Sequence, residues 1–233
     1  PSEEDIKKML KLMGVDSLDD LMKKTVPDDI LLKEELKIGK PTSEHESLKQ
    51  LKTIGEKNKV YTNYIGMGYY NTYMPNVILR NIYCNPGWYT AYTPYQPEVA
   101  QGRLEMLLNY QQMVLDFTGM DIANASLLDE ATATAEAIGL SRRIDKNNLS
   151  SVFVSKDCNP QTIDVIKTRT EVFGLKLIIG DQEKDLKNIK NDIICGVLSY
   201  PGTLGDIKNP GEAISLIHKK KGKAILICDL LAL

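Results

Sequence analysis

The strongest constraint on the fold is an alternation of short apolar runs and helical segments, which fills the chain after Asn148. The runs are continuously apolar, which is typical of strands covered on both faces of a parallel sheet. A strand–helix–strand series of this kind predicts right-handed crossovers and a doubly wound α/β sheet. We expect strands at 152–154, 176–179, 193–199 and 224–228, and helices at 160–173, 186–190 and 210–221.

Helical patterns also precede this series. An apolar stripe predicts a long helix from Glu98 to Thr118 that ends at Gly119, and a second helix, rich in alanine and threonine, begins near residue 128. Shorter helices with capping signals are expected nearer the amino terminus. We therefore expect two regions: an N-terminal helical arm over 1–59, and the first part of a large domain over 60–233, with its doubly wound sheet from about residue 150.

Charge and composition argue against several classes of function. The chain has 29 Lys and Arg against 31 Asp and Glu, a net charge of -2, which predicts no general attraction to nucleic acid or anionic lipid. No apolar run reaches the roughly 18 residues that a membrane-spanning helix needs. The four cysteines are far apart and the chain has two histidines. This composition predicts no metal site and favours a reducing compartment.

Aromatic residues gather in one stretch. Residues 60–96 hold nine of the eleven tyrosines and the single tryptophan, Trp88. Composition alone favours packing, because tyrosine buries a large ring while its hydroxyl finds a partner. The alternative is a polar-aromatic wall around a ligand, or a subunit interface.

Common nucleotide and hydrolase motifs are missing. The run from Gly66 to Asn71 begins like the glycine-rich dinucleotide fingerprint, but Asn71 stands where its third glycine belongs. The chain has neither a phosphate-binding P-loop sequence nor the G-x-S-x-G turn of serine hydrolases. These classes are therefore not expected.

Two polar features remain. A turn containing Asn124 and Ser126 leads into the alanine-rich helix, where backbone N–H groups can bind an anion, although Ser126 or Asp129 as an ordinary N-cap explains it equally. Asp229 follows the last expected strand, at the sheet edge where α/β proteins bind ligands. It can pair with a cationic ring nitrogen or cap the next turn. Together they suggest the large domain of a pyridoxal-phosphate enzyme of the aminotransferase type.

Long strings in and around the tyrosine-rich stretch resemble one family, the glycine decarboxylase (P-protein) of the glycine cleavage system. The resemblance covers essentially the whole chain. The strings that carry it are YIGMGYYNT at 64–72, NPGW at 85–88, YTPYQPEV at 92–99, QGRLE at 101–105 and ANASLLDE at 123–130.

The resemblance implies an aminotransferase-like fold of type I and a reaction that uses pyridoxal 5'-phosphate. Glycine is decarboxylated, and its aminomethyl group passes to the lipoyl arm of a carrier, the H-protein. Family members consist of two similar halves, fused or on separate subunits. The cofactor lysine lies in the second half, so the resemblance implies that this chain is a truncated first half, inactive alone, whose partner half holds the cofactor covalently.

The resemblance also implies roles for individual residues. Tyr92, Thr93, Tyr95 and Gln96, with Asn71 second, are expected to reach the partner half's pocket or to shape the lipoyl channel.

The first half's counterparts of cofactor-binding elements are expected at Asn124, Ser126 and Asp229. Tyr69 and Tyr70 are expected to be structural.

Expected partners are the second half or subunit, lipoylated H-protein and glycine, in a homodimer or heterotetramer. The expected compartment is the mitochondrial matrix, with the bacterial cytoplasm as the alternative. Two other functions stay open: a non-catalytic half that serves assembly and carrier docking, and another fold type I pyridoxal-phosphate decarboxylase.

Overall fold

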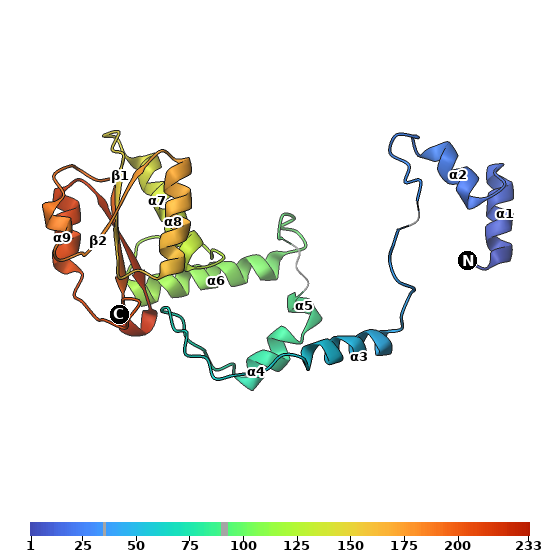
Figure 1. Ribbon diagram of the computed structural model, residues 1–233, viewed down its shortest axis with the longest axis horizontal. Helices are drawn as coiled ribbons and strands as arrows, with labels where there is room; N and C mark the ends of the chain where they lie inside the picture. Colours follow the sequence, from blue (N-terminus) through green and yellow to red (C-terminus); the bar gives the residue numbers. More distant parts are fainter. Residues whose placement is uncertain (35, 90–92) are drawn as a thin grey trace. The chain divides into compact units, whose positions relative to one another are not determined.

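A computed structural model describes residues 1–34, 36–89 and 93–233 (Figure 1). These residues form two compact units, Pro1–Thr62 and Asn63–Leu233, and each is described by itself. The division lies close to the boundary expected after residue 59. No helix of the described residues is long and apolar enough to cross a membrane.

The first unit contains three helices, α1 (Glu3–Met13), α2 (Leu18–Thr25) and α3 (Glu44–Gly55). Each begins at a serine whose hydroxyl accepts a backbone N–H, and in α1 and α3 the acidic side chain three residues on completes a capping box. Leu10 is the one buried apolar side chain among this unit's described residues. Capping therefore defines these helices more than packing does.

The second unit begins with short helical pieces. These are α4 (Asn76–Ile78), a π-helical turn η1 (Leu79–Tyr83) and α5 (Pro86–Tyr89). The long helix α6 runs from Gln101 to Thr118 and ends at Gly119, whose φ of 67° is the left-handed conformation that glycine favours.

The start of α6 differs from the sequence prediction, which placed it at Glu98. The backbone N–H of Val99 donates to Gln96, and that of Ala100 donates to Pro97. These three-residue contacts form a turn, and Ala100 has non-helical dihedral angles. The helix therefore begins only after this turn.

The remaining elements build the sheet. In chain order they are α7 (Glu130–Ile144), β1 (Ser151–Ser155), α8 (Pro160–Val172), β2 (Lys176–Gly180), η2 (Leu186–Asn188), β3 (Cys195–Tyr200), α9 (Gly211–Lys219), β4 (Lys223–Cys228) and η3 (Leu230–Ala232). All strand pairs are parallel, in the order β2-β1-β3-β4. In the register, Val152 of β1 lies opposite Leu177 of β2 and Cys195 of β3. The predicted parallel α/β sheet is confirmed.

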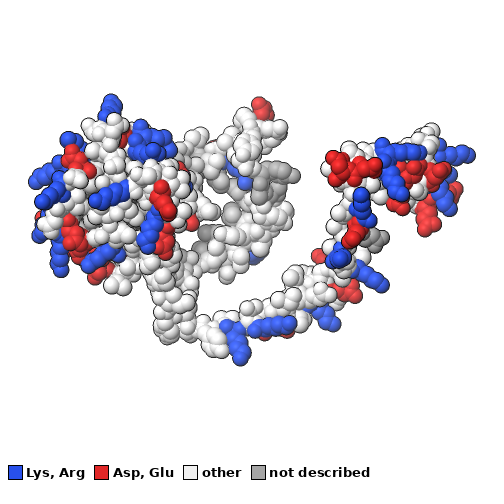
Figure 2. Space-filling model, turned by 45° about the horizontal axis from the view of Figure 1, so that its top comes forward, with Lys and Arg blue, Asp and Glu red and all other residues white. Residues whose placement is uncertain are grey.

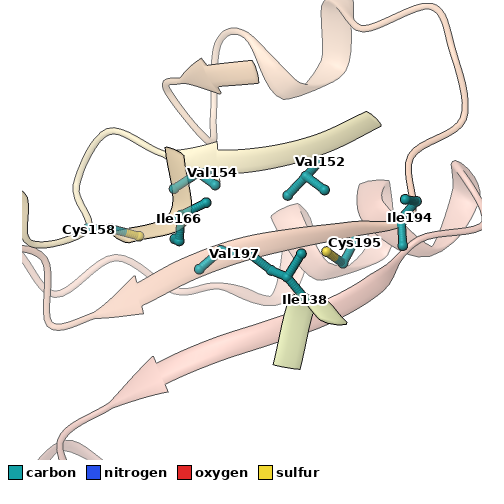
Figure 3. Close-up of a cluster of buried hydrophobic side chains, with 8 residues drawn as sticks. All are labelled: Ile138, Val152, Val154, Cys158, Ile166, Ile194, Cys195 and Val197. Atoms are coloured by element: carbon teal, nitrogen blue, oxygen red, sulfur yellow. The ribbon is translucent and has the colours of Figure 1, made fainter. Parts of the chain in front are cut away.

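Helices cover both faces of this sheet (Figure 1). On one face, Ile138 of α7 and Ile166 of α8 are fully buried against the strands (Figure 3). On the other, Ile217 of α9 packs with Phe153. Each fully buried side chain of this size stabilises the fold by roughly 1.5–3 kcal/mol, so the sheet and its three helices form the core.

The buried cysteines belong to this core. Cys195 is fully buried, and burial raises the pKa of its thiol to about 12. The pKa of Cys158 is raised to about 12 for the same reason. Both are therefore neutral thiols at physiological pH, and they pack as small buried hydrophobic side chains.

The order of the strands fixes where a ligand can bind. The crossover through α8 joins β1 to β2 on one side, and the crossover through α9 joins β3 to β4 on the other. The connections therefore diverge between β1 and β3. In α/β sheets, ligands bind at such a switch point, outside the carboxyl ends of the strands.

Charged side chains of both signs are interspersed over the face of the sheet-bearing unit shown in Figure 2.

Candidate functional site

A pocket of about 510 Å³ lies at the carboxyl edge of the sheet. We call it the sheet-edge pocket. The ends of β3 and β4 form its walls, with the segment that follows β1 and the first residue of α7. Its lining residues are Gly68, Tyr69, Tyr70, Thr72, Glu130, Asn159, Ser199, Tyr200, Pro201, Gly202, Thr203, Gly205, Ile227, Cys228 and Asp229.

Asp229 occupies the expected position directly after β4, and its carboxylate makes two contacts. One oxygen accepts the backbone N–H of Leu231 at 2.9 Å, so Asp229 caps the short helix η3. The other accepts the hydroxyl of Tyr70. The hydrogen bonds from the Tyr70 hydroxyl and then from the Leu231 N–H lower the pKa of Asp229. The hydrogen bond to Asp229 in turn raises the pKa of Tyr70. Asp229 is therefore a carboxylate at neutral pH.

Glu130 brings a second carboxylate to the pocket. It accepts the hydroxyl of Thr162 at 2.7 Å and the side-chain amide of Asn159 at 3.1 Å. Asn159 is only 6% exposed and follows β1, while Thr162 lies in the first turn of α8. The carboxylate thus links the start of α7 to the start of α8, and its position is set by buried neighbours.

Gly68 brings the tyrosine-rich segment against this cluster. Its φ is +85°, and a Cβ atom at this position would lie 1.8 Å from Oδ1 of Asn159. Glycine is therefore required here both for the backbone conformation and for the close approach.

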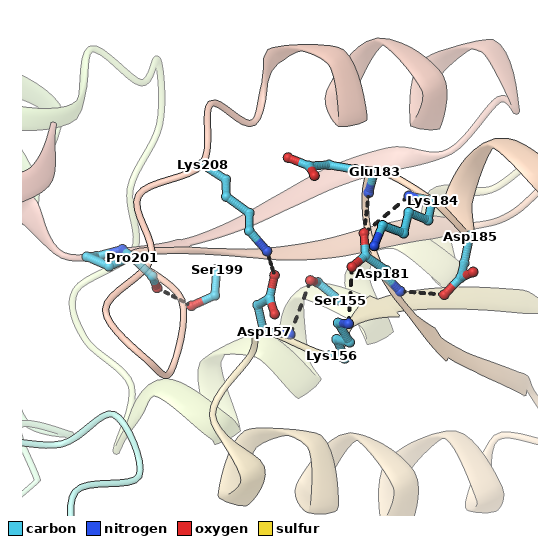
Figure 4. Close-up of polar contacts among 10 residues, drawn as sticks. All are labelled: Ser155, Lys156, Asp157, Asp181, Glu183, Lys184, Asp185, Ser199, Pro201 and Lys208. Atoms are coloured by element: carbon cyan, nitrogen blue, oxygen red, sulfur yellow. Dashed lines mark hydrogen bonds and ion pairs between the residues drawn. The ribbon is translucent and has the colours of Figure 1, made fainter.

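The loop after β3 forms another wall, and a network of contacts holds it (Figure 4). Ser199 donates its hydroxyl to the carbonyl of Pro201 at 2.7 Å, and the N–H of Thr203 donates to the carbonyl of Asp157 at 2.8 Å. The Asp157 carboxylate pairs with Lys208 at 2.6 Å, which raises the pKa of the lysine. This ion pair therefore stabilises the wall from outside the pocket.

The predicted anion-binding turn lies elsewhere. Asn124 and Ser126 line a separate hollow of about 270 Å³, which Glu130 also borders. The N-cap of α7 is Asp129, whose carboxylate accepts the N–H of Thr132 at 2.7 Å, while the Ser126 hydroxyl donates to the neighbouring carbonyl of Leu127. Of the two caps that the sequence allowed, Asp129 is the one used.

None of the predicted catalytic residues that the structure describes lines the sheet-edge pocket. Thr93, Tyr95 and Gln96 border a third hollow, of about 670 Å³, where the Tyr95 side chain is 87% exposed. Asn71 is exposed between two residues of the sheet-edge pocket. Tyr92 lies outside the described residues.

The residues of the sheet-edge pocket can be tested against pyridoxal phosphate. The Asp229 carboxylate is the group that would pair with the ring nitrogen. However, the lining includes no lysine for a Schiff base and no lysine, arginine or histidine for a phosphate. The start of α7, which would bind the phosphate, already holds its own carboxylates, Asp129 and Glu130. The described residues therefore do not fit this cofactor.

Sequence reasoning missed Tyr70, Glu130 and Asn159. Tyr70 was expected to be structural, but its contact with Asp229, 159 residues away in the chain, was not predicted. Glu130 looks in sequence like an ordinary first-turn acid, which favours the helix dipole. Gly68 was the one available signal that another segment packs closely against the backbone here, but the sequence did not indicate that this residue is Asn159.

Comparisons with known proteins agree on one family. The model of the family described as "Glycine cleavage system P-protein" matches residues 1–233. The glycine dehydrogenase (decarboxylating) of Pelagibacter ubique is 68% identical over all 233 residues of this chain, and that of Psychromonas ingrahamii is 53% identical over 97% of it. The chain spans 24% and 23% of these two proteins.

A solved structure gives the same result for the fold. The crystal structure of glycine decarboxylase (P-protein) of the glycine cleavage system, in inhibitor-bound form, matches with a TM-score of 0.83 at 30% identity. The match covers 99% of this chain and 53% of that one. The fold type I assignment and the resemblance seen in the motif strings are thereby confirmed: this chain belongs to the glycine cleavage system P-protein family.

Proposed function

We propose that the complete protein decarboxylates glycine and transfers the aminomethyl group to the lipoyl arm of H-protein. This chain is part of its N-terminal half, without the Schiff-base lysine. The observation that carries the proposal is the family match over residues 1–233, supported by 68% identity to a glycine dehydrogenase (decarboxylating). When bound, pyridoxal phosphate supplies the electron sink for the loss of carbon dioxide.

We infer that the other half holds the cofactor. The character of the sheet-edge pocket supports this division, because it offers neither an amine nor a cation. The role left for this chain is to orient groups at the other half's pocket. Tyr92, Thr93, Tyr95 and Gln96, with Asn71, are the residues proposed for it, and the exposure of Tyr95 leaves its ring and hydroxyl accessible to a partner.

The proposed partners are the second half or subunit, in a homodimer or heterotetramer, and lipoylated H-protein. For the compartment, the relatives reported above are bacterial, which favours the bacterial cytoplasm over the mitochondrial matrix.

Isotope exchange between glycine and labelled bicarbonate tests the proposal. It is measured with H-protein and pyridoxal phosphate for the chain alone, for the remainder of the protein and for the complete protein. We expect exchange from the complete protein and none from the chain alone. Full exchange by the chain alone would contradict the assignment of the lysine to the other half.

The alternative is a non-catalytic half that serves assembly and carrier docking. This alternative is favoured by the lining of the sheet-edge pocket, which does not suit the cofactor. Substituting Tyr95→Phe in the complete enzyme distinguishes a role of this chain in the reaction from a role in assembly alone. A role in the reaction predicts a loss in kcat of about a hundredfold, ~2.7 kcal/mol of transition-state stabilisation. Tyr73→Phe, in the same segment and also exposed, is the matched control. Unchanged turnover in both variants would support the assembly role.

A further inference from the structure

Two helix N-termini border the sheet-edge pocket, and a carboxylate of the chain lies at each. Glu130 is the first residue of α7 and Asn159 is the N-cap of α8, and both line the pocket. A helix N-terminus is a common binding place for phosphate, because its free N–H groups and its dipole attract negative charge. At α7 the Asp129 carboxylate accepts the N–H of Thr132 at 2.7 Å. At α8 the carboxylate is that of Glu130, which comes from the other helix.

The contacts of Glu130 at the start of α8 are those of a bound anion. Its carboxylate accepts the hydroxyl of Thr162 at 2.7 Å, and the side-chain amide of Asn159 lies 3.1 and 3.4 Å from its two oxygens. Thr162 is fully buried and Asn159 is 6% exposed, so the surrounding residues hold both donors in place. Asn159 makes no side-chain hydrogen bond to its own helix, although it is the N-cap. Its amide nitrogen is turned toward Glu130 instead, because a carboxylate can only accept.

Glu130 also borders two hollows at once. It lines the sheet-edge pocket and the smaller hollow that contains Asn124 and Ser126. A phosphate group in either hollow would therefore meet the negative charge of Glu130, and the repulsion between like charges grows where water is partly excluded. The described residues that line the two hollows include no lysine, arginine or histidine that could offset this charge.

We infer that Glu130 is a built-in anionic ligand that closes the pocket of this half to the phosphate of pyridoxal phosphate. Its carboxylate takes the place at the start of α8 that a phosphate would need. An acid in the first turn of a helix ordinarily favours the dipole of its own helix, whereas Glu130 reaches the N-terminus of the next helix. The inference rests on the proposed function, which assigns the cofactor to the other half, and it names the residue that excludes the cofactor here. Removing the side chain of Glu130 should therefore open a latent phosphate site.

Phosphate binding by the complete protein, with its cofactor bound and without glycine, tests the inference. Titration calorimetry measures the binding of inorganic phosphate, and hydrogen–deuterium exchange of the segments 130–144 and 160–172 shows whether phosphate protects α7 and α8. In wild type we expect no such protection. In Glu130→Ala we expect an added saturable site, at least about tenfold tighter than any phosphate binding at this place in wild type, with protection of both segments. Glu130→Ser, which leaves a small hydroxyl, carries the same expectation and replaces Glu130→Ala where that variant does not fold.

Two further variants are the controls. Glu130→Gln removes the same charge but keeps the volume and an acceptor for Thr162, so phosphate should protect neither segment. Glu171→Ala, at an exposed residue of α8, removes an equal charge elsewhere and should behave as wild type. The inference is overturned if phosphate protects the two segments in wild type or in Glu130→Gln, or if the folded Glu130→Ala and Glu130→Ser variants gain no site. Because the readout is phosphate binding rather than isotope exchange from glycine, failure of this inference is distinguishable from failure of the proposed function.

Discussion

At the residue scale, the position most tightly constrained is Gly68. Gly68→Ala would place a methyl group 1.8 Å from Oδ1 of Asn159 and would hold an alanine at φ +85°. Asn159 must then move, which breaks its contact with Glu130. We expect a loss of about 1–3 kcal/mol for the backbone strain alone, and more from the clash. Urea unfolding measures the change.

Gly66→Ala is the matched control for this substitution. Gly66 has φ +67°, but a Cβ atom there has nothing within 4 Å. It therefore carries the strain without the clash. Equal destabilisation by the two substitutions would show that Gly68 does not pack against Asn159 as described.

The contact between Tyr70 and Asp229 gives a second prediction. The Tyr70 hydroxyl is the main cause of the lowered pKa of Asp229, so Tyr70→Phe should raise that pKa toward its ordinary value. An NMR titration of labelled aspartate carboxyls measures it. Tyr69→Phe, at the neighbouring position, should leave the Asp229 titration unchanged. An unchanged pKa in Tyr70→Phe would place the tyrosine away from Asp229.

The sequence predicted one end of this contact and not the other. Asp229 follows an apolar strand, and the carboxyl edge of a parallel sheet is where ligands bind, so its location was derivable. Tyr70 lies in a segment without periodicity, and nothing local places it against a strand end more than a hundred residues later. Long-range contacts from irregular segments leave no pattern in the sequence.

At the scale of elements, the side chains of Asp181 and Asp185 hold the turn after β2 (Figure 4). Asp181 accepts the N–H groups of Glu183 and Lys184 at 2.9 and 3.2 Å, and it pairs with Lys156 at 3.1 Å. The Glu183 N–H first, then Lys156, lower the pKa of Asp181 to about 2.

The sign of the resulting pH dependence follows from this shift. Because the folded pKa lies below the ordinary value of 3.8, Asp181 contributes stability that is fully present above the unfolded pKa and is lost as pH falls toward about 2. Asp181→Asn should be less stable than wild type at neutral pH, and the difference should shrink between pH 4 and 2. Urea unfolding at a series of pH values tests this. Asp164→Asn, at an exposed residue of α8, is the control for the loss of one negative charge.

Most helices and strands were predictable from the sequence where apolar residues recur in a regular pattern. The four strands and α8 and α9 lie within a few residues of their predicted bounds, because continuous apolar runs and helix caps encode them locally. The start of α6 was not predictable, because the residues around Pro97 are compatible both with a turn and with the first turn of a helix. Tertiary contacts decide between the two.

At the scale of the whole molecule, the segment before the sheet differs from the sheet in how many of its large apolar and aromatic side chains are exposed. From Asn63 to Pro97 the sequence has one charged residue, Arg80, yet many of its large apolar and aromatic side chains are exposed. Examples are Tyr64, Tyr73 and Tyr95, at 89%, 102% and 87%. Composition alone favoured packing for this stretch, and these three side chains do not pack within the unit. Their burial, if any, depends on contacts with other parts of the complete protein.

This exposure leads to a prediction about the isolated chain. So many exposed large apolar and aromatic side chains in one segment are unusual for a soluble monomer. The isolated 233-residue chain should therefore bind the dye 1-anilinonaphthalene-8-sulfonate and self-associate as its concentration rises. The complete protein should do neither at the same molar concentration. Sedimentation velocity and dye fluorescence measure the two effects.

A triple variant, Tyr64→Ser, Tyr73→Ser and Tyr95→Ser, separates this surface from exposure caused by general unfolding. All three side chains are exposed, so the sheet and its helices should keep their stability while dye binding falls. Dye binding that persists in the variant would place the apolar surface elsewhere. A fall in sheet stability would show instead that these tyrosines pack against the core.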